Sequence, residues 1–267
     1  MTTARHAASE EQGTALRILA FQRAASAARE HQRVGPFLVR LTPGTKHPML
    51  NYAVPDDGAV PSPDDVDDLE VAFERRGLTP RLEYPHAAAP GLEAVLLGCG
   101  FGLERRLPVM ACIPSTAPAR YVAPGFSVTV VDSDRDHVAA IVVADEAYGE
   151  LGDPPDAAAV AARRRLSAEG GAVVLAREAA SGEPAGSGMY PVPRSGVSEL
   201  AGIGTKPAFR NRGVASSVVG ALVELAARRG LELLWLTPED EQAERIYTRS
   251  GFSRSGVVMV HISAPRA

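Results

Sequence analysis

The sequence has few cysteines, few lysines and no long hydrophobic run. Its two cysteines, Cys99 and Cys112, are too few for a disulfide framework, and neither has a partner at zinc-ligand spacing. The six histidines are scattered, so no metal site is expected. No apolar stretch approaches the roughly 20 residues that a membrane-spanning helix needs. Lysine occurs only twice and the net charge is −4, which argues against nucleic acid as a partner.

The composition is otherwise that of an ordinary globular protein. Of the 267 residues, 45% are hydrophobic and 22% are charged, as in a typical folded domain. A prior of about 150 residues per domain gives one or two domains. Near the N-terminus, Arg17 and Arg23 interrupt the apolar positions, whereas a secretion signal needs an unbroken apolar core. We therefore expect a cytoplasmic protein with no membrane partner.

An internal repeat is the most informative feature of the sequence. Residues 69–85 and 222–238 each read as a helix that ends in Arg-Arg-Gly, followed by a leucine-led strand and a proline. A second pair of helices, at 92–101 and 243–252, ends each time in Gly-Phe, and a strand follows each. Agreement over helix, strand, helix and strand predicts two copies of one α/β unit.

The two copies are expected to divide the chain into domains at 1–120 and 121–267, joined by a proline-rich stretch. In the second copy, the sequence predicts strands and helices that follow one another along the chain. One strand is expected over 195–205. A helix is expected over 213–229, because its apolar residues recur with the 3.6-residue period of a helix.

An arginine-rich turn connects this strand to this helix. It reads Arg210-Asn211-Arg212-Gly213-Val214-Ala215. The first amides of a helix have no partner within the helix, and the helix dipole adds positive potential there. Gly213 lets the backbone approach a ligand closely, and Ala215 is too small to obstruct it. The turn therefore predicts an anion site; the alternative is an ordinary helix N-terminus with surface arginines.

The turn and a second motif further along the chain resemble the GNAT superfamily of acyl-CoA-dependent N-acyltransferases. Arg210–Ala215 matches that family's pyrophosphate loop, R/Q-x-x-G-x-G/A, and Ala243–Phe252 is similar to its next motif, in which a tyrosine, here Tyr247, precedes Gly-Phe by four residues. The resemblance covers about residues 125–263. It implies an α/β (α+β) fold of two tandem GNAT-like units, each a mixed, mostly antiparallel sheet with flanking helices, in which the fourth and fifth strands splay apart.

The resemblance also implies acetyl-CoA as co-substrate, without a metal. The pantetheine arm would bond to the fourth strand, and the pyrophosphate would bind the amides at the start of the helix. Asp240 stands where the family often has a cofactor-contacting asparagine, and a carboxylate there can only accept hydrogen bonds. The implied cofactor-binding residues are Ile203, Gly204, Thr205, Arg210, Asn211, Arg212, Gly213, Val214, Ala215, Ser216 and Asp240.

The implied reaction is direct transfer of an acetyl group from the thioester to a primary amine of a small-molecule or peptide acceptor. An alkylammonium has a pKa near ~10 and must lose a proton before it attacks. Glu199 is the implied general base, and Tyr247 the implied acid that protonates the leaving thiolate. Backbone N–H groups at a bulge of the fourth strand would hold the oxyanion. The alternatives are a solvated strand residue for Glu199 and a core aromatic for Tyr247.

The first copy departs from the family pattern. The positions that correspond to the arginine-rich turn read Asp57–Ser62, and Leu96 stands where Tyr247 stands in the second copy. Acidic side chains there oppose a diphosphate. We expect this degenerate half to bind no acyl-CoA and to shape an acceptor site in or near the cleft between the copies. Assembly into a homodimer is left open.

Two other functions remain open at this point. One is a non-catalytic acyl-CoA-binding sensor or partner-binding protein, which would need the arginine-rich turn but neither Glu199 nor Tyr247. The other is a transferase that uses a longer acyl-CoA as donor.

Overall fold

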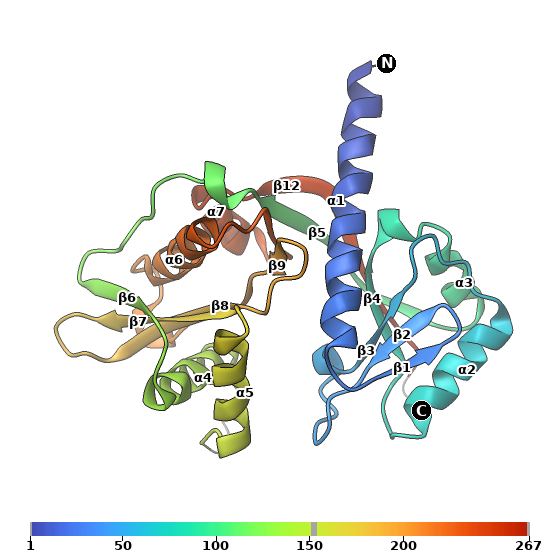
Figure 1. Cartoon of the computed structure of the whole chain (residues 1–267), viewed down its shortest axis with the longest axis horizontal. Coiled ribbons are helices and arrows are strands. Elements are labelled where there is room, and N and C mark those ends of the chain that lie inside the picture. The colour runs from blue at the N-terminus through green and yellow to red at the C-terminus, as the bar shows by residue number, and fades with distance from the viewer. Residues whose placement is uncertain (1, 151–153, 266–267) are drawn as a thin grey trace. The chain divides into compact units, whose positions relative to one another are not determined.

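A computed structural model describes residues 2–150 and 154–265, and the chain forms two compact α/β units. Unit 1 comprises Met1–Val109 and Arg254–Ala267, and unit 2 comprises Met110–Ser253. Figure 1 labels most of the helices and strands of both units. The helix, strand, helix and strand of the predicted repeat are present in each copy: α2 (Pro63–Glu74), β4 (Arg81–Pro85), α3 (Leu92–Gly98) and β5 (Gly102–Cys112) recur as α6 (Val214–Arg228), β11 (Leu233–Leu236), α7 (Glu241–Arg249) and β12 (Ser253–Ser263).

Unit 1 is built on a mixed sheet with the long helix α1 (Thr2–Ala27) packed on it. The strands, in spatial order, are β1 (His31–Val34), β2 (Phe37–Arg40), β3 (Tyr52–Pro55), β4, β12 and β5. The pairs β1–β2, β2–β3 and β4–β12 are antiparallel, whereas β3 and β4 are parallel. Within residues 2–150 and 154–265, no helix combines the length and the apolar character that crossing a bilayer requires.

In unit 1, the helix that corresponds to α6 is closed at its N-terminus by its own side chains. Ser62 is the N-cap of α2, and its hydroxyl accepts a hydrogen bond from the Asp65 amide at 3.2 Å. The Asp65 carboxylate in turn accepts one from the Ser62 amide at 2.8 Å. These bonds form a capping box, and they hold the pKa of Asp65 below its usual value. Side chains of the capping box thus already bond the Ser62 and Asp65 amides at the N-terminus of α2.

The last strand of the second copy belongs to unit 1, and the end of the last strand of the first copy belongs to unit 2. In unit 1, β12 pairs with β4 along Met259–Ser263. In unit 2, the end of β5, Met110–Cys112, pairs with β11. The units therefore differ from the division into 1–120 and 121–267 that the repeat suggested. We call this arrangement the strand exchange.

Unit 2 is a sheet with helices on both faces. Along β7, Val174 and Ala176 belong to the buried cluster beneath α6, whereas Val173 and Leu175 pack with α4 on the opposite face. In Figure 1, α4 and α5 lie on one side of β7 and β8, and α6 lies on the other. The antiparallel strands, in order, are β6 (Phe126–Val130), β7 (Ala172–Glu178), β8 (Pro184–Tyr190) and β10 (Ala201–Thr205), and the helices of that first face are α4 (Asp134–Tyr148) and α5 (Ala157–Ala168).

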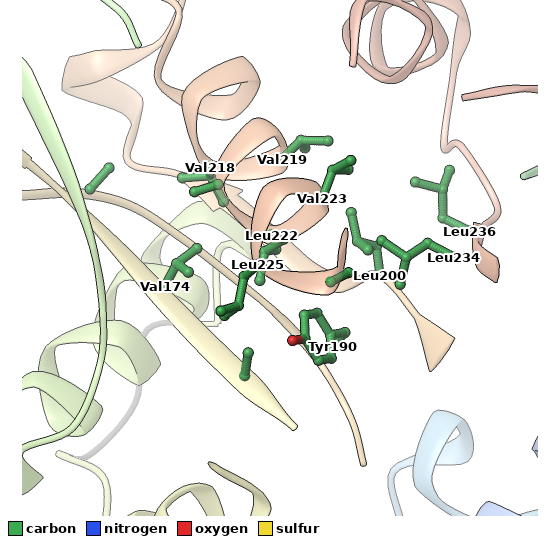
Figure 2. Close-up of a cluster of buried hydrophobic side chains, with 14 of the residues drawn as sticks. Val174, Tyr190, Leu200, Val218, Val219, Leu222, Val223, Leu225, Leu234 and Leu236 are labelled. Carbon is green, nitrogen blue, oxygen red and sulfur yellow. The ribbon is translucent and has the colours of Figure 1, made fainter. Parts of the chain in front are cut away.

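The core of unit 2 explains why α6 forms where the periodicity predicted it. Val218, Leu222 and Leu225 are buried on one face of α6, and Figure 2 shows them beside Val174 and Tyr190 of the sheet. Burial of each such aliphatic side chain contributes about 1.5–3 kcal/mol. This packing fixes the start of α6, which comes directly after the arginine-rich turn, against the sheet.

Candidate functional site

The strand expected over 195–205 is in fact two strands that separate at Leu200. The first, β9 (Val197–Glu199), pairs in parallel with β11 and places Glu199 opposite Trp235. The Leu200 amide still donates to the Trp235 carbonyl at 2.8 Å. From Ala201 onward, β10 pairs instead with β8. The fourth and fifth strands of the predicted fold therefore splay apart, as the resemblance implied.

Two glycines fit β10 into this position. Gly202 has φ of +59° where the register with β8 shifts, a conformation that favours glycine. A Cβ atom on Gly204 would lie 2.8 Å from the Cβ of Ala147 in α4. Without a side chain at Gly204, the C-terminal end of α4 can lie directly against β10.

Two carbonyls of β10 beside the split already accept side-chain hydrogen bonds, and one hydroxyl has no partner among the described residues. The Ile203 carbonyl accepts a hydrogen bond from the Tyr148 hydroxyl at 3.2 Å, and the Thr205 carbonyl accepts one from Arg210 Nε at 3.4 Å. The Thr205 hydroxyl oxygen is buried, with no hydrogen-bond partner among the described residues. A buried hydroxyl without a partner costs about 1–3 kcal/mol, so a ligand that bonded to it would recover this cost.

A cavity of about 610 Å³ lies at the N-terminus of α6. Asn211 and Gly213 have φ of +60° and +80°, and this left-handed turn leads the chain into the helix. No side chain caps the first turn of α6, which leaves its amides available to an anion. The predicted ligand residues that line this cavity are Thr205, Arg210, Asn211, Gly213, Val214, Ala215 and Ser216.

The two arginines of the turn have different environments. Arg210 lines the cavity and donates to the Ala147 carbonyl at 3.0 Å. Arg212 forms an ion pair with Glu178 at 2.7 Å, and its guanidinium lies 4.7 Å from the ring centre of Phe126. The hydrogen bond from Arg212 holds the pKa of Glu178 below its usual value. The Arg212 side chain thus stabilises the turn, and Arg212 is not among the residues that line the cavity.

Sequence reasoning missed two further arginines. Arg245 and Arg249 of α7 line the same cavity, together with Gln242 and Ile246. Positions 242, 245, 246 and 249 follow the i, i+3, i+4, i+7 spacing of a single helix face. This spacing in the sequence could have identified Arg245 and Arg249 as residues on one face of the helix. With Arg210, these side chains place three guanidinium groups around the uncapped start of α6, where they can bind phosphate oxygens.

Tyr247 lies on α7 and packs partly against the core of unit 2. Its ring meets that of Phe252 edge-on, with 6.1 Å between ring centres. Burial, followed by the nearby Tyr148 and Asp240, raises the pKa of Tyr247 to about 12. The phenol therefore keeps its proton at neutral pH. The phenol of Tyr148 is close enough to raise the pKa of Tyr247. The sequence analysis indicated only one phenol at this site, that of Tyr247.

Six predicted residues lie outside this cavity lining: Glu199, Ile203, Gly204, Arg212, Asp240 and Tyr247. Asp240 is the N-cap of α7, and its carboxylate accepts a hydrogen bond from the Ala243 amide at 2.8 Å. Glu199 is half-buried and is the last residue of β9, directly before the strands separate. Within the described ranges, no three His, Cys, Asp or Glu residues group as a metal site would require.

A Gly213→Ala variant is expected to be less stable than a Gly230→Ala variant. Both glycines have a positive φ, which costs an alanine about 1–2 kcal/mol. Around Gly230 a new Cβ would meet nothing within 4 Å, whereas at Gly213 it would lie 3.1 Å from Ala123 and 3.2 Å from Tyr121. Urea-unfolding midpoints measure the difference. Equal midpoints would show that the close approach of Tyr121 and Ala123 carries no cost.

Comparisons with known proteins found a matching family model and several solved structures with a similar fold. The family model described as the acetyltransferase (GNAT) family matches residues 138–252. A GCN5-related N-acetyltransferase from Kribbella flavida is similar with a TM-score of 0.78 and 27% identity, over 95% of this chain and 96% of that one. Comparison with curated proteins gave no significant match.

Two further solved structures share the fold at lower identity. A GCN5-related N-acetyltransferase from Sphaerobacter thermophilus has a TM-score of 0.56 and 20% identity, over 71% of this chain and 61% of that one. A tandem GNAT protein from the clavulanic acid biosynthesis pathway has a TM-score of 0.60 and 15% identity, over 86% of this chain and 79% of that one.

Proposed function

We propose that this protein, whose residues 138–252 match the model of the acetyltransferase (GNAT) family, transfers an acetyl group from acetyl-CoA to a primary amine. The acceptor in this proposal is a small molecule or a peptide. The observation that carries the proposal is the 610 Å³ cavity, in which Arg210, Arg245 and Arg249 surround the uncapped first turn of α6. The backbone amides, the helix dipole and the three guanidinium groups together favour the binding of a diphosphate.

The proposed binding mode is based on the groups that lie at each side of this turn. The diphosphate would accept hydrogen bonds from the first amides of α6. The pantetheine arm would run along β10. There the carbonyls of Ile203 and Thr205 each accept one hydrogen bond already and keep a second lone pair for its amides, and the Thr205 hydroxyl has no partner among the described residues. The thioester would then lie near the point where β9 and β10 separate, with Tyr247 and Glu199 on neighbouring elements.

The chemistry proposed for these residues balances in protons. Glu199, directly or through a water molecule, takes the proton that the amine must lose before its nitrogen attacks the thioester carbonyl. When the C–S bond breaks, the leaving sulfur receives a hydrogen bond and then a proton from Tyr247. The nitrogen, which still carries one surplus proton after its attack, returns that proton to the Tyr247 oxygen directly or through water as the amide forms. The pKa of Tyr247, about 12, lies above that of a free thiol. Its first contribution is therefore to stabilise the leaving sulfur as a hydrogen-bond donor.

The wild-type protein is expected to bind one acetyl-CoA per chain and to release free thiol only when an amine is present. The first copy contributes no second site in this proposal, because Asp65 closes the N-terminus of α2. Calorimetry measures the stoichiometry, and thiol detection with a panel of amines measures turnover. Two sites per chain would contradict the inactivity of the first copy.

The same measurements separate the other possible functions. Tight binding without turnover on any amine would support a non-catalytic acyl-CoA sensor. Greater thermal stabilisation by longer acyl-CoAs would support a different donor, since each buried CH₂ adds about 0.8 kcal/mol. No binding of CoA at all would contradict the proposal entirely.

A further inference from the structure

A second cavity, of about 370 Å³, lies next to the first in unit 2. Gly213, Ser216 and Arg249 line both cavities, so the two spaces meet at the first turn of α6. The opposite wall of the second cavity is the segment Pro118–Tyr121, within the proline-rich stretch after β5. A ligand seated in the first cavity can therefore extend into the second.

The segment that forms this wall is fixed to α6. The Ala123 amide donates to the Ser217 hydroxyl at 2.9 Å, and Arg120 pairs with Glu224 at 3.3 Å. A Cβ atom on Gly220 would lie 3.4 Å from the Arg120 side chain, so the glycine lets the segment approach the helix closely. These contacts hold the wall in place before any ligand binds.

Tyr121 is the aromatic side chain of this wall. Its ring approaches Gly213 closely, because a Cβ atom there would lie 3.2 Å from both Cε1 and the hydroxyl oxygen of Tyr121. The side chain is nevertheless 52% exposed. Pro118 and Val223 add apolar surface, and Arg249 adds positive charge at the border with the first cavity. An exposed ring beside a basic group suits a flat, charged ligand.

We propose that Tyr121 stacks on the adenine ring of the acyl-CoA and that the 370 Å³ cavity binds its 3′-phosphoadenosine end. This inference rests on the proposed function. The pantetheine arm and the adenosine are attached to opposite ends of the diphosphate of CoA. The pantetheine arm takes the Thr205 side of the first cavity, and the adenosine takes the side shared with the second. Arg249 is then placed for the ribose 3′-phosphate. The stretch between the repeats thus supplies a specificity-determining residue.

The first test compares Tyr121→Ala with Tyr121→Phe, a variant that keeps the ring and loses only the hydroxyl. We expect Tyr121→Ala to bind CoA and 3′,5′-ADP about tenfold more weakly, and to bind phosphopantetheine, which lacks the adenosine, as the wild type does. Tyr121→Phe should retain the affinity for all three. Equal weakening for phosphopantetheine would indicate a merely structural role, and unchanged affinity for 3′,5′-ADP would overturn the stacking.

A second measurement tests the stacking without removing the aromatic side chain at position 121. The only tryptophan of the chain, Trp235, is 1% exposed, so a Tyr121→Trp variant adds one accessible fluorophore. We expect 3′,5′-ADP to quench its emission. The matched control is Val122→Trp, at the next residue, whose side chain is 43% exposed and does not line the cavity. Equal quenching in both variants, or none in either, would contradict stacking at Tyr121.

The outcomes also distinguish this inference from the proposed function. If the wild type binds neither acetyl-CoA nor CoA, the proposed function fails. If it binds both and Tyr121→Ala binds them equally well, the proposed function stands and the assignment of the adenine site to the second cavity fails.

Discussion

A Ser216→Glu variant is expected to bind acetyl-CoA at least about 100-fold more weakly than the wild type, a difference of about 3 kcal/mol. Ser216 is the third residue of α6 and lines both cavities. A carboxylate at this position would lie beside the amides that are proposed to hold the diphosphate, and like charges repel. Isothermal titration with acetyl-CoA measures the effect.

The control for this variant is Ser216→Gln, which has nearly the same shape without the charge. We expect it to weaken binding less than about tenfold. Stability should not fall in the glutamate variant, because an acidic residue in the first turn favours a helix by about 0.3–1 kcal/mol. A thermal unfolding midpoint at or above that of the wild type would exclude misfolding as the cause. Equal affinities for Glu and Gln would show that no anion binds at the start of α6.

A Tyr247→Phe variant is expected to lower kcat about 100-fold, within the range that a positioned acid contributes, and to leave the affinity for acetyl-CoA unchanged. The phenol has a pKa of about 12, so it keeps its proton throughout the working range. Consequently, the wild-type rate should not decline between about pH 8 and pH 10 through ionisation of this group. Thiol release under single-turnover conditions, across that pH range, checks both expectations.

The matched control is Tyr148→Phe. Tyr148 is the second phenol beside the split strand, and its hydroxyl bonds to the Ile203 carbonyl. If Tyr247 is the acid, Tyr148→Phe should reduce kcat far less than Tyr247→Phe does. The reverse result would assign the acid role to Tyr148. Turnover unaffected by either substitution would mean that no tyrosine protonates the leaving sulfur.

Local patterns explain which parts of the fold could be predicted from the sequence. The helix over 213–229 was predictable because its buried residues follow the 3.6-residue period, and the structure confirms it as α6. The separation of the strands at Leu200 was expected only through the family resemblance. Local patterns alone do not indicate it, because residues on both sides of Leu200 are extended. Strand pairing depends on which sheet edge is open, so the strand exchange could not be read from two repeats that are alike.

The same distinction applies to the candidate site. The turn at Gly213 was predictable because a left-handed backbone favours glycine, and the structure shows φ of +80° there. The direction of the Arg212 side chain was not predictable, because it depends on Glu178 and Phe126, which are remote in sequence. Tyr121 was overlooked for the same reason: the contacts of its ring exist only after folding.

Because of the strand exchange, deletion of either half of the chain would disturb the fold of the other half. Deleting the front half would remove Met110–Cys112 and leave β11 with an unpaired edge, which invites aggregation. Deleting the back half would remove β12 and strip β4 of a neighbour. Neither half can be discarded by a simple truncation. Even if the first copy binds no acyl-CoA, as we propose, the second copy would still need it to complete its fold.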